Sequence, residues 1–221
     1  MPRRKKAVSR RRPRRRYRRV FRRKRQVSTM PDRFRCKLVY GQTFGATAIT
    51  TPANELVIGA NSLFDPGQAS DVKQPYFYDQ MAAMYNKYLV HASKVTMIFA
   101  TDTGTTVGFV GYVYPNTTTT SLFQNVSNII TMPRVRYNFT LSQGSVGNKV
   151  SNYMKTKRMY NIANLKDNEE FKALVSAEPA TKWYWLCGVQ PINQSTSTSG
   201  DYIVKVTYYV EFSDRKQQSA S

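Results

Sequence analysis

The chain has 221 residues, of which 41% are hydrophobic, and its formal net charge is +21. This length suits one large domain that buries its own core, and the strongly basic balance predicts a polyanionic partner. No run of eighteen apolar residues occurs, and the N-terminus has no apolar stretch typical of a signal peptide. We therefore expect neither a membrane-spanning segment nor secretion.

The N-terminal segment is a polycation. The first 25 residues hold 13 Arg and 3 Lys with no acidic residue, whereas residues 26–221 hold 18 basic and 13 acidic residues. Such a composition cannot form a core, so we expect residues 1–30 to be a disordered arm. Guanidinium groups bind phosphate oxygens in pairs and stack on bases, and the interleaved Tyr17 and Phe21 suit unpaired bases. The arm residues predicted to contact nucleic acid are Arg3, Arg4, Lys5, Lys6, Arg10, Arg11, Arg12, Arg14, Arg15, Arg16, Tyr17, Arg18, Arg19, Arg22, Arg23, Lys24 and Arg25.

The same basic run predicts a nuclear localisation signal that import receptors bind. Import and nucleic-acid binding use the same residues, so the two roles are compatible. A mitochondrial presequence fits less well, because the segment has no apolar face.

The first strand of the body follows the arm directly. Residues 33–40 place Phe34, Cys36, Leu38 and Tyr40 on one face and Arg33, Arg35 and Lys37 on the other. This basic face either continues the phosphate track of the arm or is a solvated strand face, and the sequence leaves both interpretations open. The cluster of Lys155, Lys157 and Arg158 is a second candidate of the same kind.

Period-two alternation dominates the rest of the body. It predicts strands at 95–100, 106–114, 134–141 and 202–212, and another around residue 185. In the third of these we expect Val135, Tyr137, Phe139 and Leu141 to face the core. In the fourth, the core-facing set is Tyr202, Val204, Val206, Tyr208, Val210 and Phe212. Near residue 185 the alternation places Trp183 and Trp185 in the core and leaves Tyr184 as an exposed aromatic residue.

Helical signals are few. Asp79 is a candidate cap for a short helix that ends at Tyr85, and Asp167–Val175 is a second candidate. About eight strands with long connections indicate an all-β chain, a single eight-stranded antiparallel jelly-roll sandwich with short helices in its loops. The expected domains are the arm at 1–30, the jelly roll at 31–215 and a short tail at 216–221.

The search for catalytic groups finds little. His91 is the only histidine, so a multi-histidine metal site is excluded, and we expect His91 to be a hydrogen-bonded structural residue. Cys36 and Cys187 lie far apart in apolar contexts, which suits buried thiols in a reducing compartment. The chain has no glycine-rich phosphate loop. These observations predict a protein that is not an enzyme and that needs no metal or cofactor.

Several segments, in this order and spacing, resemble the capsid proteins of circovirus-like viruses, whose circular single-stranded DNA encodes a replication initiator. They are RFRCKLVYGQTF (33–44), NSLFDP (61–66), QPYFYDQMAAMYNKYLVHASKV (74–95), MKTKRMYNI (154–162), TKWYWLCGVQP (181–191) and TYYVEFSDR (207–215). The resemblance implies a jelly roll that self-assembles into an icosahedral T=1 shell of sixty copies. It also implies that the arm lies inside on the viral genome, that the arm directs nuclear import, and that the protein resides in the virion and, during assembly, in the host nucleus.

Other partners follow from these interpretations. A protein of this kind expressed alone is expected to take up host nucleic acid, and a shell is expected to bind a host-surface glycan or receptor. The alternative function is a cellular nucleic-acid-binding protein of ribosomal type with a basic extension. The nearly neutral body argues against it, because such proteins usually carry basic residues over the folded domain as well.

Overall fold

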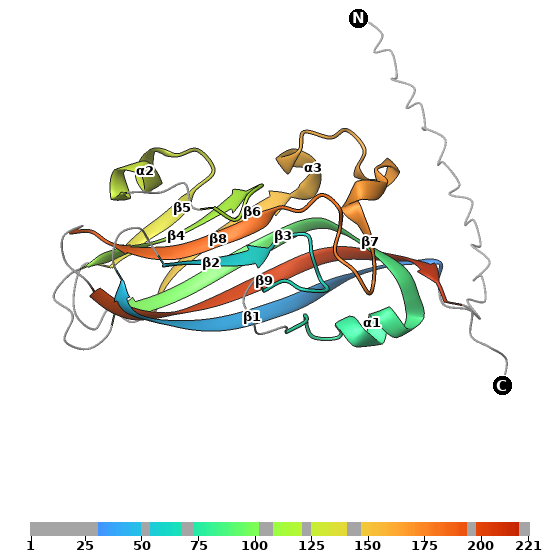
Figure 1. Ribbon diagram of the computed structural model, residues 1–221, viewed down its shortest axis with the longest axis horizontal. Helices are drawn as coiled ribbons and strands as arrows, with labels where there is room; N and C mark the ends of the chain where they lie inside the picture. The colour runs from blue at the N-terminus through green and yellow to red at the C-terminus, as the bar shows by residue number, and fades with distance from the viewer. Residues whose placement is uncertain are drawn as a thin grey trace, which may run out of the picture. The chain divides into compact units, whose positions relative to one another are not determined.

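The computed structural model describes residues 31–49, 54–67, 73–101, 108–120, 125–140, 147–193 and 198–216, and they form two antiparallel β-sheets packed face to face (Figure 1). The strands are β1 (Arg33–Ile49), β2 (Asn54–Gly59), β3 (Tyr85–Thr101), β4 (Phe109–Asn116), β5 (Arg136–Thr140), β6 (Asn148–Lys155), β7 (Lys172–Leu174), β8 (Tyr184–Pro191) and β9 (Thr198–Arg215). The helices are α1 (Tyr78–Met84), α2 (Val126–Thr131) and α3 (Thr156–Met159), with single 3-10 turns at Leu165–Asp167 and Glu169–Phe171.

The strand order is that of a jelly roll. One sheet has the order β1-β9-β3-β6, and the other has the order β2-β8-β4-β5. We call them the first and the second sheet. Successive strands mostly alternate between the sheets, and β1 pairs with β9, so the first and last strands lie side by side. The predicted all-β fold with eight sandwich strands is confirmed, and the short β7 is an addition that pairs with β3 beyond the end of β6.

The core between the sheets follows the predicted alternation closely. The six predicted core residues of β9 are each at most 1% exposed. Trp183 and Trp185 are fully buried, with ring centroids 5.2 Å apart. The indole N–H of Trp185 donates to Ser93 Oγ at 2.8 Å, so the polar edge of this buried ring is satisfied. Gly111 shows a close approach, because a Cβ there would lie 2.4 Å from the Phe99 ring.

Both predicted helices differ in detail. The α1 helix starts after Phe77, which has a left-handed backbone and no side-chain cap, so Asp79 lies in the first turn instead of capping it. Tyr85 begins β3 and belongs to the core rather than to the helix. The predicted helix at Asp167–Val175 is wrong: Asn168 is extended between the two 3-10 turns, and pairing with β3 draws Lys172–Leu174 into the sheet.

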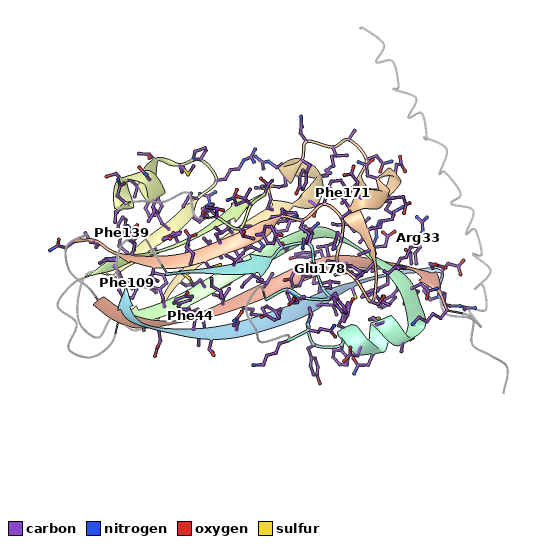
Figure 2. The ribbon with its side chains drawn as sticks, viewed as in Figure 1. Arg33, Phe44, Phe109, Phe139, Phe171 and Glu178 are labelled. Carbon is purple, nitrogen blue, oxygen red and sulfur yellow. The ribbon has the colours of Figure 1, made fainter. Side chains whose placement is uncertain are left out.

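The aromatic residues of the second sheet are the main departure from the predicted faces. Tyr137 and Phe139 pair with Tyr112 and Val110, so they lie on the outer face of the second sheet and are 41% and 39% exposed. Tyr184, which was expected to be exposed, is only 8% exposed. Tyr184 packs in a second apolar cluster with Ile129 of α2. Figure 2 labels Phe139 on the side of the sandwich that carries α2.

Candidate nucleic-acid interface

The predicted nucleic-acid contacts fall into two groups. The arm residues from Arg3 to Arg25 lie outside the described residues. Arg33, Arg35 and Lys37 lie on β1, where all three are exposed. Leu38 and Tyr40 are buried in the core between the sheets, so the strand alternation turns the basic side chains to the outer face of the first sheet.

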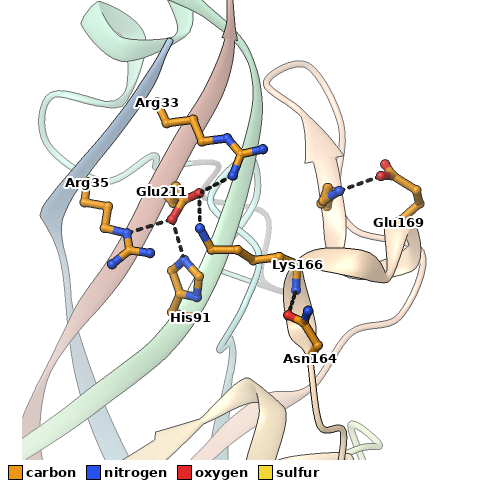
Figure 3. A network of polar contacts seen from close by, with 8 residues as sticks. Arg33, Arg35, His91, Asn164, Lys166, Glu169 and Glu211 are labelled. Atoms are coloured by element: carbon orange, nitrogen blue, oxygen red, sulfur yellow. Dashed lines mark hydrogen bonds and ion pairs between the residues drawn. The ribbon is translucent and has the colours of Figure 1, made fainter. Parts of the chain in front are cut away.

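A buried carboxylate organises one end of this outer face. Glu211 on β9 pairs directly with Arg35 across the β1–β9 ladder, and its side chain is 6% exposed. The Arg35 Nε donates to Glu211 Oε2 at 2.7 Å, and the Lys166 Nζ donates to Oε1 at 2.8 Å. The Arg33 guanidinium lies 3.8 Å from Oε1, and Figure 3 shows these groups converging on one carboxylate. We call this set, with His91, the Glu211 cluster.

A β-bulge brings His91 into the cluster. The register of β3 against β9 shifts between Val90 and Ala92, so His91 is an extra residue on its strand. Its Nε2 lies 3.1 Å from Glu211 Oε2. Bulges re-aim a side chain in this way, and here the bulge turns an imidazole onto the outer face. The prediction that His91 is a hydrogen-bonded structural residue is confirmed.

The charges in the cluster determine its protonation. Burial alone would raise the pKa of Glu211, but hydrogen bonds from Lys166, Arg35 and His91 outweigh it and lower that pKa to about 2. Burial lowers the pKa of His91, and the positive charges of Arg35 and Lys166 act in the same direction against the hydrogen bond to Glu211. At neutral pH the imidazole is therefore uncharged and donates its Nε2 hydrogen to the carboxylate.

The cluster keeps an excess of positive charge. Three permanent cations face one carboxylate, and the side chains of Arg33 and Arg35 are 67% exposed. Arg35 bonds Glu211 through its Nε, and its largely exposed guanidinium is a group that suits phosphate oxygens. A pocket of about 360 Å³ opens beside it, lined by Arg35, Lys37, His91 and Tyr209. We call it the β1 pocket.

Further lysines extend the positive charge along the first sheet. Lys94 and Lys205 are exposed on β3 and β9, and Lys149 and Lys155 are exposed on β6. The strand register places these side chains on the same outer face as Lys37. β9 carries three acidic residues, Asp201, Glu211 and Asp214, and Asp201 lies near the opposite end of the strand from Glu211.

The predicted second cluster also lines a pocket. Lys155, Lys157 and Arg158 line a hollow of about 380 Å³ at the end of β6 and the start of α3, together with Tyr153. We call it the α3 pocket. Neither Tyr153 nor Tyr209 stands out in the sequence, because each lies on the polar face of an alternating strand. Their approach becomes visible only when β6, β3 and β9 are placed side by side.

Other kinds of site have little support. In the described ranges no group of three His, Cys, Asp or Glu side chains is placed to hold a metal ion. Cys187 is fully buried and Cys36 half-buried, and both are free thiols. Burial raises the pKa of both thiols, which disfavours the reactive thiolate. No helix of the described part of the chain is long and apolar enough to cross a membrane.

Comparison with known proteins gives similarities to viral capsid structures. No protein-family model matches the chain, and no curated protein matches its sequence. The 60-mer BFDV capsid protein is 14% identical, with a TM-score of 0.48, over 86% of this chain and 97% of that chain. The decameric BFDV capsid protein is 17% identical, with a TM-score of 0.45, over 81% and 99%. The Cocksfoot mottle virus structure is 12% identical, with a TM-score of 0.46, over 84% and 97%.

Proposed function

We propose that this chain is the structural protein of a small icosahedral shell and that it packages single-stranded circular DNA through its Arg-rich arm. The observation that carries the proposal is the separation of charge: 16 of the 34 basic residues lie in the first 25 positions, ahead of a jelly roll. Phosphate binding by Lys and Arg releases condensed counterions, so such an arm binds nucleic acid strongly and with little regard to sequence.

Exposed apolar side chains on the body support assembly with further copies. Tyr76 and Phe77 before α1 are 75% and 54% exposed, and Tyr137 and Phe139 on β5 form an edge-on ring pair that is also open to solvent. Exposed aromatic groups of this kind are typical of protein interfaces, where Tyr and Phe add contact area at a low entropic cost. We assign these two patches to contacts between copies of the chain.

The arm links assembly to packaging. A shell of sixty copies (T=1) would enclose on the order of a thousand positive charges, which repel one another unless a polyanion is present. Packaged nucleic acid therefore stabilises the shell. The same residues serve as the signal for nuclear import receptors, so assembly takes place in the host nucleus before the protein leaves in the virion. The outer surface of the shell then carries the host receptor or glycan contacts.

Electron microscopy of the full-length protein tests this proposal together with the absorbance ratio at 260 and 280 nm. We expect small, uniform particles that contain nucleic acid. A variant in which Arg10, Arg11, Arg12, Arg14, Arg15 and Arg16 are changed to Gln should form fewer particles, with less nucleic acid in each. A full-length protein that stays monomeric would favour the alternative function, a cellular nucleic-acid-binding protein. Particles that contain no nucleic acid would contradict the packaging role proposed for the arm.

A further inference from the structure

Two tyrosines lean toward each other across the outer face of the first sheet. Tyr209 lies on β9 and Tyr153 on β6, with β3 between them. Two strand spacings amount to about 9.6 Å, yet the ring centroids are 5.8 Å apart at an interplanar angle of 88°. In the register of β3, the small Ala92 lies beside Tyr209 and the exposed Lys94 lies beside Tyr153. Tyr153 keeps 46% of its surface exposed.

The tyrosine pair connects the two basic pockets. Tyr209 lines the β1 pocket, whose basic residues are Arg35 and Lys37. Tyr153 lines the α3 pocket, whose basic residues are Lys155, Lys157 and Arg158. The Lys37 ammonium already lies 5.3 Å from the centre of the Tyr209 ring. The outer face therefore presents cations, an aromatic pair and more cations in one line across the four strands.

This sequence of groups fits the chemistry of a single strand of nucleic acid. A single strand offers an unpaired base between two phosphates, whereas a duplex keeps its bases stacked inside. An exposed aromatic ring flanked by cations binds a base on the ring and the adjoining phosphates on either side. No acidic residue of the described part of the chain lines either pocket. Glu211 does not compete with a phosphate for free cations, because it is already paired with Arg35 and Lys166.

We propose that the outer face of the first sheet binds one short segment of single-stranded nucleic acid. A base stacks on Tyr153, Tyr209 holds that ring in place, and the neighbouring phosphates lie in the β1 and α3 pockets. The inference rests on the proposed packaging function, because it places the packaged strand on the body as well as on the arm. Of the two interpretations of the basic face of β1, it favours phosphate binding over a strand face that is merely solvated.

Photocrosslinking of the full-length protein tests the site. The probes are single-stranded oligonucleotides with 5-iodouracil, one built on deoxyribose and one on ribose, and adducts are located by mass spectrometry. We expect adducts in the arm and on Tyr153, with both sugars if the shared base and phosphate chemistry is what binds. An adduct with only one sugar identifies the kind of strand that the site selects.

Variants give the energetic readout. Tyr153→Ala should weaken binding about tenfold at salt concentrations that reduce phosphate contacts, whereas Tyr153→Phe should bind normally because it keeps the ring. Leu174→Ala removes an apolar side chain of similar exposure that lines neither pocket, and it is the matched control. If Tyr153→Ala fails to fold, the double variant Lys157→Gln/Arg158→Gln changes only exposed charges and should reduce the salt dependence of binding.

The outcomes separate the two proposals. A full-length protein that binds no oligonucleotide at low salt would contradict the packaging function itself. Strong binding with adducts confined to residues 1–30, and with Tyr153→Ala binding as well as Leu174→Ala, would leave packaging intact and overturn the site on the sheet.

Discussion

Arg35 and Glu211 lie directly opposite each other on β1 and β9, and their side chains are joined by a 2.7 Å bond from Nε to Oε2. The pair connects the strand that follows the arm to the last strand of the sandwich. The two members differ sharply in exposure, because the carboxylate is buried while 67% of the Arg35 side chain is open to solvent. Their contributions to stability should differ for the same reason.

Glu211→Gln should lower the free energy of unfolding by about 3 kcal/mol. The folded protein holds the pKa of Glu211 at about 2 against an ordinary value of 4.5, and each unit is worth ~1.4 kcal/mol. Arg35→Gln should cost less than about 1 kcal/mol, because Lys166 and His91 still pair with the carboxylate and an exposed ion pair contributes little. Urea unfolding of the unassembled protein measures both, and equal losses would contradict this assignment.

Stability should fall in two stages as the pH decreases. The folded pKa of His91 is below its ordinary value of 6.5, so protons bind the unfolded chain first and stability falls as the pH decreases below about 6.5. The folded pKa of Glu211 is also lowered, so its contribution is complete above 4.5 and is lost as the pH falls toward 2. Melting temperatures across this range should show both stages.

The matched variant for the first stage is His91→Gln, which cannot be protonated but can still donate a hydrogen bond to Glu211. It should flatten the upper stage of the profile, which begins as the pH falls below about 6.5, and leave the lower stage unchanged. If the variant had the same pH profile as the parent protein, the upper stage would have to come from a group other than His91.

Gly111→Ala should destabilise the sandwich by about 1–3 kcal/mol. A methyl group there would meet the Phe99 ring at 2.4 Å, and a packed core accommodates such an insertion only by moving side chains or backbone. Gly41→Ala is the control for adding a methyl group to a strand, because Gly41 is exposed and the nearest atom to its new Cβ would be the Val204 carbonyl oxygen at 3.9 Å. Thermal unfolding should separate the two variants, and a stable Gly111→Ala protein would contradict the close approach.

The sequence predicted most of the fold but only part of the candidate site. Strict alternation identifies the core residues of β9, because one face of that strand is buried and the other is polar. The faces of β5 could not be assigned this way, because α2 buries much of the other side of the second sheet and makes that face apolar as well. The buried Glu211 escaped prediction because the groups that pair with it, among them Lys166, lie far from it along the chain.

Assembly should depend on the exposed aromatic pair of β5. Replacing Tyr137 and Phe139 together by Ser should reduce particle formation strongly, and it should lower the free energy of unfolding by about 2–3 kcal/mol because both rings are more than half buried. Ile203→Ser, on the outer face of the first sheet and 52% exposed, is the control for loss of exposed apolar area. Analytical ultracentrifugation measures assembly, and normal shells from the double variant would exclude this patch as an interface.

The number of phosphates held by the arm should be visible in the salt dependence of binding. Each phosphate neutralised on a single strand contributes about 0.7 to the slope of log K against log salt. Changing Arg10, Arg11, Arg12, Arg14, Arg15 and Arg16 to Gln should therefore reduce that slope by up to about 4 if all six contact phosphates. Lys at the same six positions keeps the charge and should preserve the slope, with some affinity lost because an ammonium cannot grip phosphate in pairs. An unchanged slope in the Gln variant would show that the main phosphate contacts lie on the body, with Arg35 and Lys37 the first residues to examine.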